Sequence, residues 1–150
     1  MLLLNHYLCK FHSQYTEQIN KGKDMSPNLA YSTYSQNNIS IESSEKLIQM
    51  LYEGILRFTS QAKRAIELGD KEKKTYWINR TVAIFSELLN SLDYNAGDIS
   101  HYLSGLYIHQ IKTLVDANVN DDIQKLDQVL HVTKELLEAW KEETNLEMAE

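Results

Sequence analysis

The side chains that could do chemistry in this chain are three histidines and several carboxylates in its second half. His101, His109 and His131 each stand alone in segments predicted to be helical. A di-iron bundle needs Glu-x-x-His pairs on facing helices, and a zinc protease helix needs His-Glu-x-x-His. The sequence has neither pattern, and carboxylate pairs such as Glu135 and Glu138 are typical of solvated helix faces. We therefore expect no enzyme activity, no metal and no cofactor.

One histidine has a neighbour that leaves a second interpretation open. His109 and Lys112 form a His-x-x-Lys pattern of the kind found in histidine phosphotransfer domains, which are four-helix bundles with an exposed imidazole. Such domains usually have glycine next, whereas Thr113 follows here. The alternative is a polar histidine at the edge of a packed helix face.

The composition sets the class of protein. A chain of 150 residues with 43% hydrophobic residues, one Pro and five Gly suits one domain of long helices. The single Cys9 allows no internal disulfide, which favours a reducing, cytoplasmic compartment. A net charge of −6 argues against nucleic acid and against anionic membranes. No apolar run approaches the roughly 18 residues of a membrane span, so we expect no membrane insertion.

The beginning of the chain differs from the rest. Residues 1–24 are mixed and polar, and Met25 opens a stretch that is typical of a protein start. We expect residues 1–24 to be a poorly ordered extension outside the native start, with a short, loosely docked amphipathic helix as the alternative. Residues 25–43 are rich in Ser and Asn and predict a flexible arm that lies on the rest of the protein.

Apolar residues then recur every three or four positions in four successive segments, as one buried helix face requires. Capping residues and Gly69 delimit these segments. The four predicted helices run over residues 44–68 with Ser43 as N-cap, from the cap Asp70 to Leu92, over residues 98–117, and from a cap at Asn120 or Asp121 to Glu143. Short loops between them predict an antiparallel up-down four-helix bundle over residues 44–145.

Tyrosine is more abundant than a dry core needs. The chain has nine Tyr against three Phe, and each buried hydroxyl requires a hydrogen-bond partner. Apolar and aromatic groups also cover more than one narrow stripe of the third predicted helix. This surplus favours a protein that binds another polypeptide, or a bundle that only dimerises through its surplus face.

Several short patterns resemble the FliS family of flagellin-specific export chaperones, in order and spacing over about residues 29–143. They are Ala30-Tyr31-x-x-Tyr34-x-x-Asn37, Ser44-x-x-Leu47-x-x-Met50-Leu51-Tyr52-Glu53-Gly54, Leu103-x-x-Leu106-Tyr107, Ala117-Asn118 and Leu136-x-x-Ala139-Trp140. The chain departs from the family at Ser43-Ser44, where Ser-Pro is frequent, and at Ile108-His109, where an acidic or polar pair is frequent.

The resemblance implies a cytoplasmic chaperone that holds one flagellin C-terminal segment, prevents its premature polymerisation and delivers it to the flagellar type III export apparatus. The export gate and a co-chaperone or regulator are further partners that it implies. Client side chains would enter grooves between bundle helices as a disordered segment becomes ordered.

The resemblance also suggests the residues of the site. The expected lining of the client-binding groove is Tyr52, Leu103, Leu106, Tyr107 and Leu114. The expected members of the displaceable N-terminal arm are Tyr31, Tyr34, Asn37 and Ile39. A phosphotransfer bundle acting through His109 and a purely dimerising bundle stay as alternatives.

Overall fold

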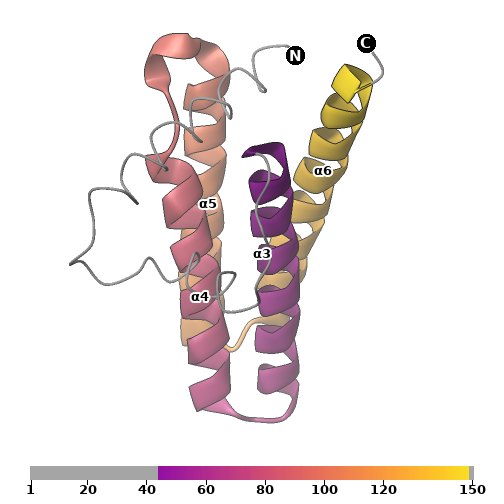
Figure 1. Ribbon diagram of the computed structural model, residues 1–150. Helices are drawn as coiled ribbons and strands as arrows, with labels where there is room; N and C mark the ends of the chain where they lie inside the picture. Colours follow the sequence, from indigo (N-terminus) through magenta and orange to yellow (C-terminus); the bar gives the residue numbers. More distant parts are fainter. Residues whose placement is uncertain (1–43, 149–150) are drawn as a thin grey trace, which may run out of the picture.

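The computed structural model describes residues 44–148, which form four long α-helices and one short 3₁₀ helix (Figure 1). These elements are α3 (Ser44–Glu67), α4 (Lys71–Asn90), η1 (Tyr94–Ala96), α5 (Asp98–Asn120) and α6 (Ile123–Met148). No strand occurs within the described range, so the prediction of an all-α four-helix bundle is confirmed. The predicted extension at residues 1–24, the arm at residues 25–43 and the cap at Ser43 lie outside the described residues.

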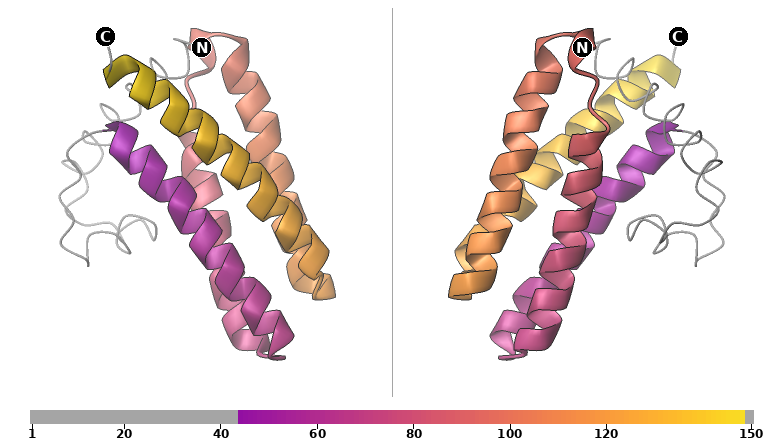
Figure 2. Two further views of the ribbon diagram at one scale, coloured as in Figure 1. Left: turned by 90° about the vertical axis from the view of Figure 1, so that its right-hand side faces the viewer. Right: turned by 90° about the vertical axis from the view of Figure 1, so that its left-hand side faces the viewer.

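The four helices close into a ring. Consecutive helices pack side by side, and α6 returns to pack against α3. Figure 2 shows α3 and α6 running beside each other and crossing the pair formed by α4 and α5. As a result, α3 and α5 face each other diagonally across the core.

Local sequence explains the turn between the first two helices. Gly69 adopts a φ of 70°, the left-handed conformation that glycine reaches without the penalty of a Cβ atom. Asp70 then caps α4 by accepting a hydrogen bond from the Lys73 amide at 3.0 Å. Both predicted signals are confirmed, and they bring the start of α4 back against the end of α3.

The connection between the last two helices differs from the prediction. Helix α5 does not end at Ala117 but continues to Asn120, and Asp121 takes the left-handed conformation with a φ of 53°. The residue that caps α6 is Asp122, whose carboxylate accepts a hydrogen bond from the Lys125 amide at 3.2 Å. The expected cap at Asn120 or Asp121 was therefore wrong, and α6 also continues past Glu143 to Met148.

A long-range contact explains the later end of α5. The Lys74 side chain of α4 is almost fully buried, and its ammonium donates to the Asn118 carbonyl at 2.7 Å and to the Asp121 carboxylate. A cation at a helix C-terminus pairs with carbonyl groups that have no partner within the helix. The hydrogen bond from Lys74 lowers the pKa of Asp121 below its ordinary value.

We predict that Lys74→Ala destabilises the bundle by about 1–3 kcal/mol, because it removes a buried, charged hydrogen-bond donor from the end of α5. Lys73→Ala is the matched control, since the Lys73 side chain is 73% exposed. Urea unfolding of both variants measures the difference. Because the pKa of Asp121 is lowered, the effect of Lys74→Ala should be largest above the ordinary aspartate pKa of 3.8 and narrow as the pH falls below it. Equal stability of the two variants would contradict the role of Lys74.

Candidate functional site

Most of the predicted groove residues lie in the core of the bundle. Tyr52, Leu103, Tyr107 and Leu114 have exposed fractions of 6% or less, and Leu106 is half-buried against the same core. The structure therefore brings them together by packing, and four of the five present almost no surface to a partner. Their role in client binding stays a prediction, and the arm residues Tyr31, Tyr34, Asn37 and Ile39 lie outside the described residues.

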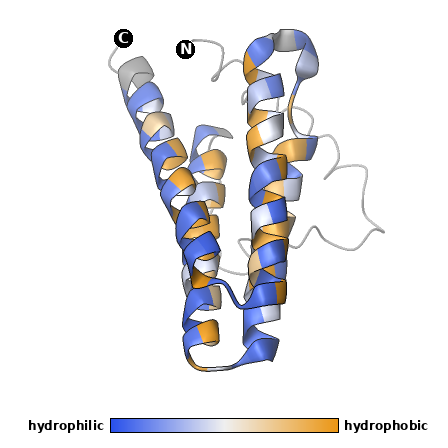
Figure 3. Ribbon diagram, turned by 180° about the vertical axis from the view of Figure 1, so that it is seen from behind, coloured by the Kyte–Doolittle hydropathy of each residue, from blue (hydrophilic) through white to orange (hydrophobic). Residues whose placement is uncertain are grey.

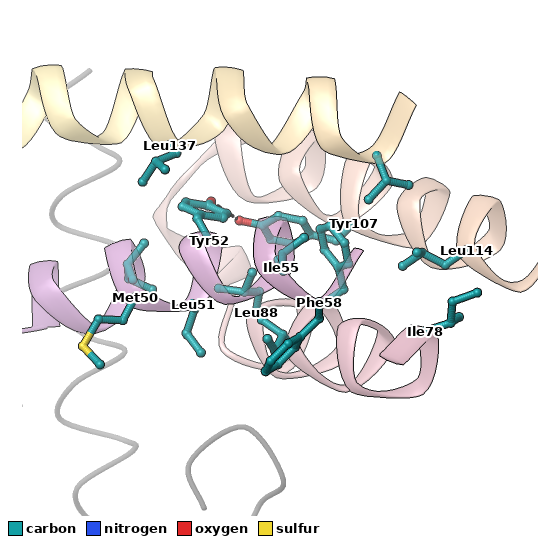
Figure 4. Packing of buried hydrophobic residues seen from close by; sticks show 14 of the residues in the cluster. Met50, Leu51, Tyr52, Ile55, Phe58, Ile78, Leu88, Tyr107, Leu114 and Leu137 are labelled. Atoms are coloured by element: carbon teal, nitrogen blue, oxygen red, sulfur yellow. Dashed lines mark hydrogen bonds between the residues drawn. The ribbon is translucent and has the colours of Figure 1, made fainter. Parts of the chain in front are cut away.

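Two of these residues form a polar contact inside the core. The hydroxyls of Tyr52 on α3 and Tyr107 on α5 are hydrogen-bonded at 2.7 Å, and Figure 4 shows the two side chains pointing toward each other. The Phe85 ring of α4 lies 5.9 Å from the Tyr107 ring, between centroids. Burial raises the pKa of Tyr52 to about 12 and that of Tyr107 well above its ordinary value. Both phenols are thus neutral structural groups.

The outer boundary between α4 and α5 has a different character. The Thr75 hydroxyl donates to the Asn118 side-chain oxygen at 3.2 Å, which sets the register of the two helices. Val82 lies seven residues after Thr75 and Ile111 seven before Asn118, so each shares a helix face with the bonded residue. Because the helices run in opposite directions, Val82 and Ile111 lie opposite each other at this boundary. Both are half-buried and pack against the core.

Beside this boundary between α4 and α5, α5 exposes apolar side chains to solvent. Ile108, Val115 and Val119 are exposed by 39%, 52% and 75%, at the helical spacing that keeps them on one side of α5. Figure 3 shows apolar residues recurring among polar ones along this helix. We refer to the following residues as the α4/α5 strip: Val82, Leu89, Ile108, Ile111, Val115 and Val119. A row of exposed aliphatic residues costs free energy in water, so it is typical of a surface that a partner covers.

The sequence patterns did not single out this strip. Apolar residues cover more than one stripe of the third helix in the sequence, and that observation contained the necessary signal. The residues that match the family patterns, such as Leu103 and Tyr107, turn into the core. Ile108, which follows Tyr107, and Val119, which follows the Ala117-Asn118 pattern, are exposed instead.

The three histidines considered for chemistry do not come together in one site. His109 is exposed on α5, as is His101, whose ring lies 5.3 Å from that of Tyr94. His131 lies 3.3 Å from the Glu135 carboxylate on the surface of α6. Within residues 44–148, no three His, Cys, Asp or Glu side chains are grouped so that they could hold a metal ion. None of the described helices is both long and apolar enough to cross a membrane.

A helical bundle with an apolar strip on its surface is suited to binding another polypeptide. Comparison with known families gives the particular assignment. The family model described as "Flagellar protein FliS" matches residues 26–147. The chain therefore belongs to the FliS family, whose members are chaperones and not enzymes.

Individual relatives agree with this assignment. The chain is 53% identical over 124 residues to the flagellar secretion chaperone FliS of Campylobacter jejuni, which covers 82% of this chain and 97% of that protein. It is 31% identical to the proteins of the same name from Bacillus subtilis and Salmonella typhimurium. These matches cover 75% and 67% of this chain, and 84% and 76% of the relatives.

We predict a strong energetic coupling between the two core tyrosines. Tyr52→Phe or Tyr107→Phe alone should each cost about 1–2 kcal/mol, because each leaves one buried hydroxyl without its partner. The double variant should cost less than the sum of the two, because it leaves no buried hydroxyl at this place. A double-mutant cycle from urea unfolding measures the coupling. Strictly additive effects would show that the hydrogen bond contributes nothing to stability.

Proposed function

We propose that this chain is a cytoplasmic chaperone that binds the C-terminal segment of flagellin in a one-to-one complex. It keeps that segment from polymerising prematurely and delivers it to the flagellar type III export apparatus. Membership of the FliS family supports the chaperone role, and the α4/α5 strip is the observation that carries the binding proposal.

The strip suits an amphipathic helix as its occupant. Its exposed members Ile108, Val115 and Val119 extend over three turns of α5, so they present a row about 16 Å long. An amphipathic helix places apolar side chains at the same three- and four-residue intervals and can lay them along such a row. The half-buried Val82 and Ile111 provide a floor that is already packed against the core. The client gains burial while the bundle itself changes little.

A shallow binding surface also suits a client that must be released for export. A client that must be released cannot be bound near the upper limit of affinity, and a shallow aliphatic strip offers moderate burial rather than a deep pocket. A segment that folds as it binds gives up part of its interaction free energy in becoming ordered, which keeps the complex reversible. Covering the client's apolar side chains prevents their self-association until the export apparatus takes over.

We predict that Val119→Gln weakens binding of the flagellin C-terminal segment about three- to tenfold, and that Val115→Gln/Val119→Gln weakens it further, since each change removes aliphatic contact area. Isothermal titration calorimetry with the host's flagellin segment measures the affinity and the stoichiometry. A negative heat-capacity change should accompany binding to the unmodified chain, because apolar surface is buried.

Leu68→Gln is the matched control for this experiment. Leu68 is 74% exposed, as Val119 is 75% exposed, but it follows the end of α3 and so lies outside the two helices that form the strip. The proposal requires the control to bind with the affinity of the unmodified chain. If both variants bind equally well, the strip is not the docking surface. If light scattering shows a dimer that Val115→Gln/Val119→Gln disrupts, the strip serves self-association instead.

A further inference from the structure

The charges of this acidic chain are strongly segregated. Residues 57–80, which form the hairpin of α3 and α4, contain seven of the 15 basic residues and three of the 21 acidic ones. Residues 81–150 contain four basic and 13 acidic residues. The hairpin segment is therefore positive on a protein whose net charge is −6, and two of its cations, Lys63 and Lys74, pair with Asp127 and Asp121.

Within this hairpin, two guanidinium groups from different helices converge on one aromatic ring. The Cζ atoms of Arg57 and Arg80 each lie 5.3 Å from the centroid of the Phe58 ring. Arg80 also lies 5.2 Å from the Tyr76 ring, and Phe58 stacks on Trp77 at 5.3 Å. Aromatic faces attract cations, so the Phe58 ring stabilises both guanidinium groups at this place.

More exposed cations continue the same two faces. Arg64 follows Arg57 by seven residues on α3, and Lys73 precedes Arg80 by seven on α4, so each pair shares a helix face. Arg64 is exposed and the Lys73 side chain is 73% exposed, with Asp70 as its ion-pair partner at 3.3 Å. We name the basic–aromatic face by its residues: Arg57, Arg64, Lys73, Tyr76 and Arg80.

We propose that the basic–aromatic face binds an acidic segment of another polypeptide, with carboxylates meeting the arginines and an apolar or aromatic side chain meeting Tyr76. Tyr76 is 49% exposed, and aromatic and arginine residues are the types that contribute most to protein interfaces. A short acidic segment fits better than nucleic acid, because a long polyanion would extend from this small face onto the acidic remainder of the chain.

This second surface is separate from the client strip. Arg80 turns toward α3, where its guanidinium lies over the Phe58 ring, and Tyr76 lies beside Arg80 on α4. Thr75, in contrast, turns toward α5 through its bond to Asn118. The two surfaces thus occupy opposite edges of α4. A chaperone with this arrangement can hold an apolar client on one side and contact an acidic partner on the other.

Fluorescence anisotropy with a labelled peptide of repeated Glu-Glu-Phe tests this proposal on the full chain. Arg64→Glu/Lys73→Glu should weaken binding about tenfold or more, because it reverses two exposed charges of the face, and added salt should weaken binding to the unmodified chain. Lys112→Glu/Lys134→Glu changes the net charge by the same amount at exposed positions on α5 and α6, and should alter affinity less than about twofold. Circular dichroism checks that both variants stay folded.

Several results would overturn the proposal. These are no binding of the peptide, equal binding of a Gln-Gln-Phe peptide, or equal losses in the two charge-reversal variants. Tighter binding of a single-stranded oligouridylate at the same residues would assign the face to nucleic acid. A dimer that only Arg64→Glu/Lys73→Glu disrupts would assign it to a second copy of this chain. Val115→Gln/Val119→Gln should leave peptide binding unchanged, so this proposal can fail or succeed independently of the client strip.

Discussion

Two phenol hydroxyls in the centre of an apolar bundle must pair with each other or cost free energy, and much of this molecule depends on that constraint. Tyr52 and Tyr107 meet across the diagonal of the ring, on helices α3 and α5. A slip of α5 by one turn, about 5.4 Å, would bury both hydroxyls without a partner. The hydrogen bond therefore specifies one register for α5, and Lys74 holds the far end of the same helix through Asn118 and Asp121.

Once α5 is fixed in this way, its outer side is fixed as well. The helix buries Leu103, Tyr107 and Leu114 in the core and still exposes three aliphatic residues, Ile108, Val115 and Val119. Burying them within one chain would require a fifth element against α4 and α5, and a client helix can serve as that element. Since the core is complete without the client, binding and release need not unfold the chaperone. The basic–aromatic face on the other edge of α4 gives the bundle a second, chemically different surface.

Local signals in the sequence predicted the fold, but they did not single out the exposed strip. Periodicity, Gly69 and Asp70 predicted four helices and the first turn, because these signals act within a few residues. The end of α5 was misplaced since it depends on Lys74, more than forty residues away in sequence. Helical spacing shows that Tyr107 and Ile108 point in different directions but not which of them faces the core. That choice depends on the packing of all four helices, so the sequence alone did not show that Tyr107 is buried and Ile108 exposed.

Methyl-resolved NMR during titration with the flagellin C-terminal segment can locate the client on the bundle, because it distinguishes methyl groups of the outer strip from those of the core. We expect the largest shift changes at the methyl groups of Ile108, Val115 and Val119, while those of Leu103 and Leu114 stay nearly unchanged. The contrary result, with the largest changes at Leu103 and Leu114 and little effect on the strip, would mean that the client enters an opened core. The α4/α5 strip would then not be the client-binding surface.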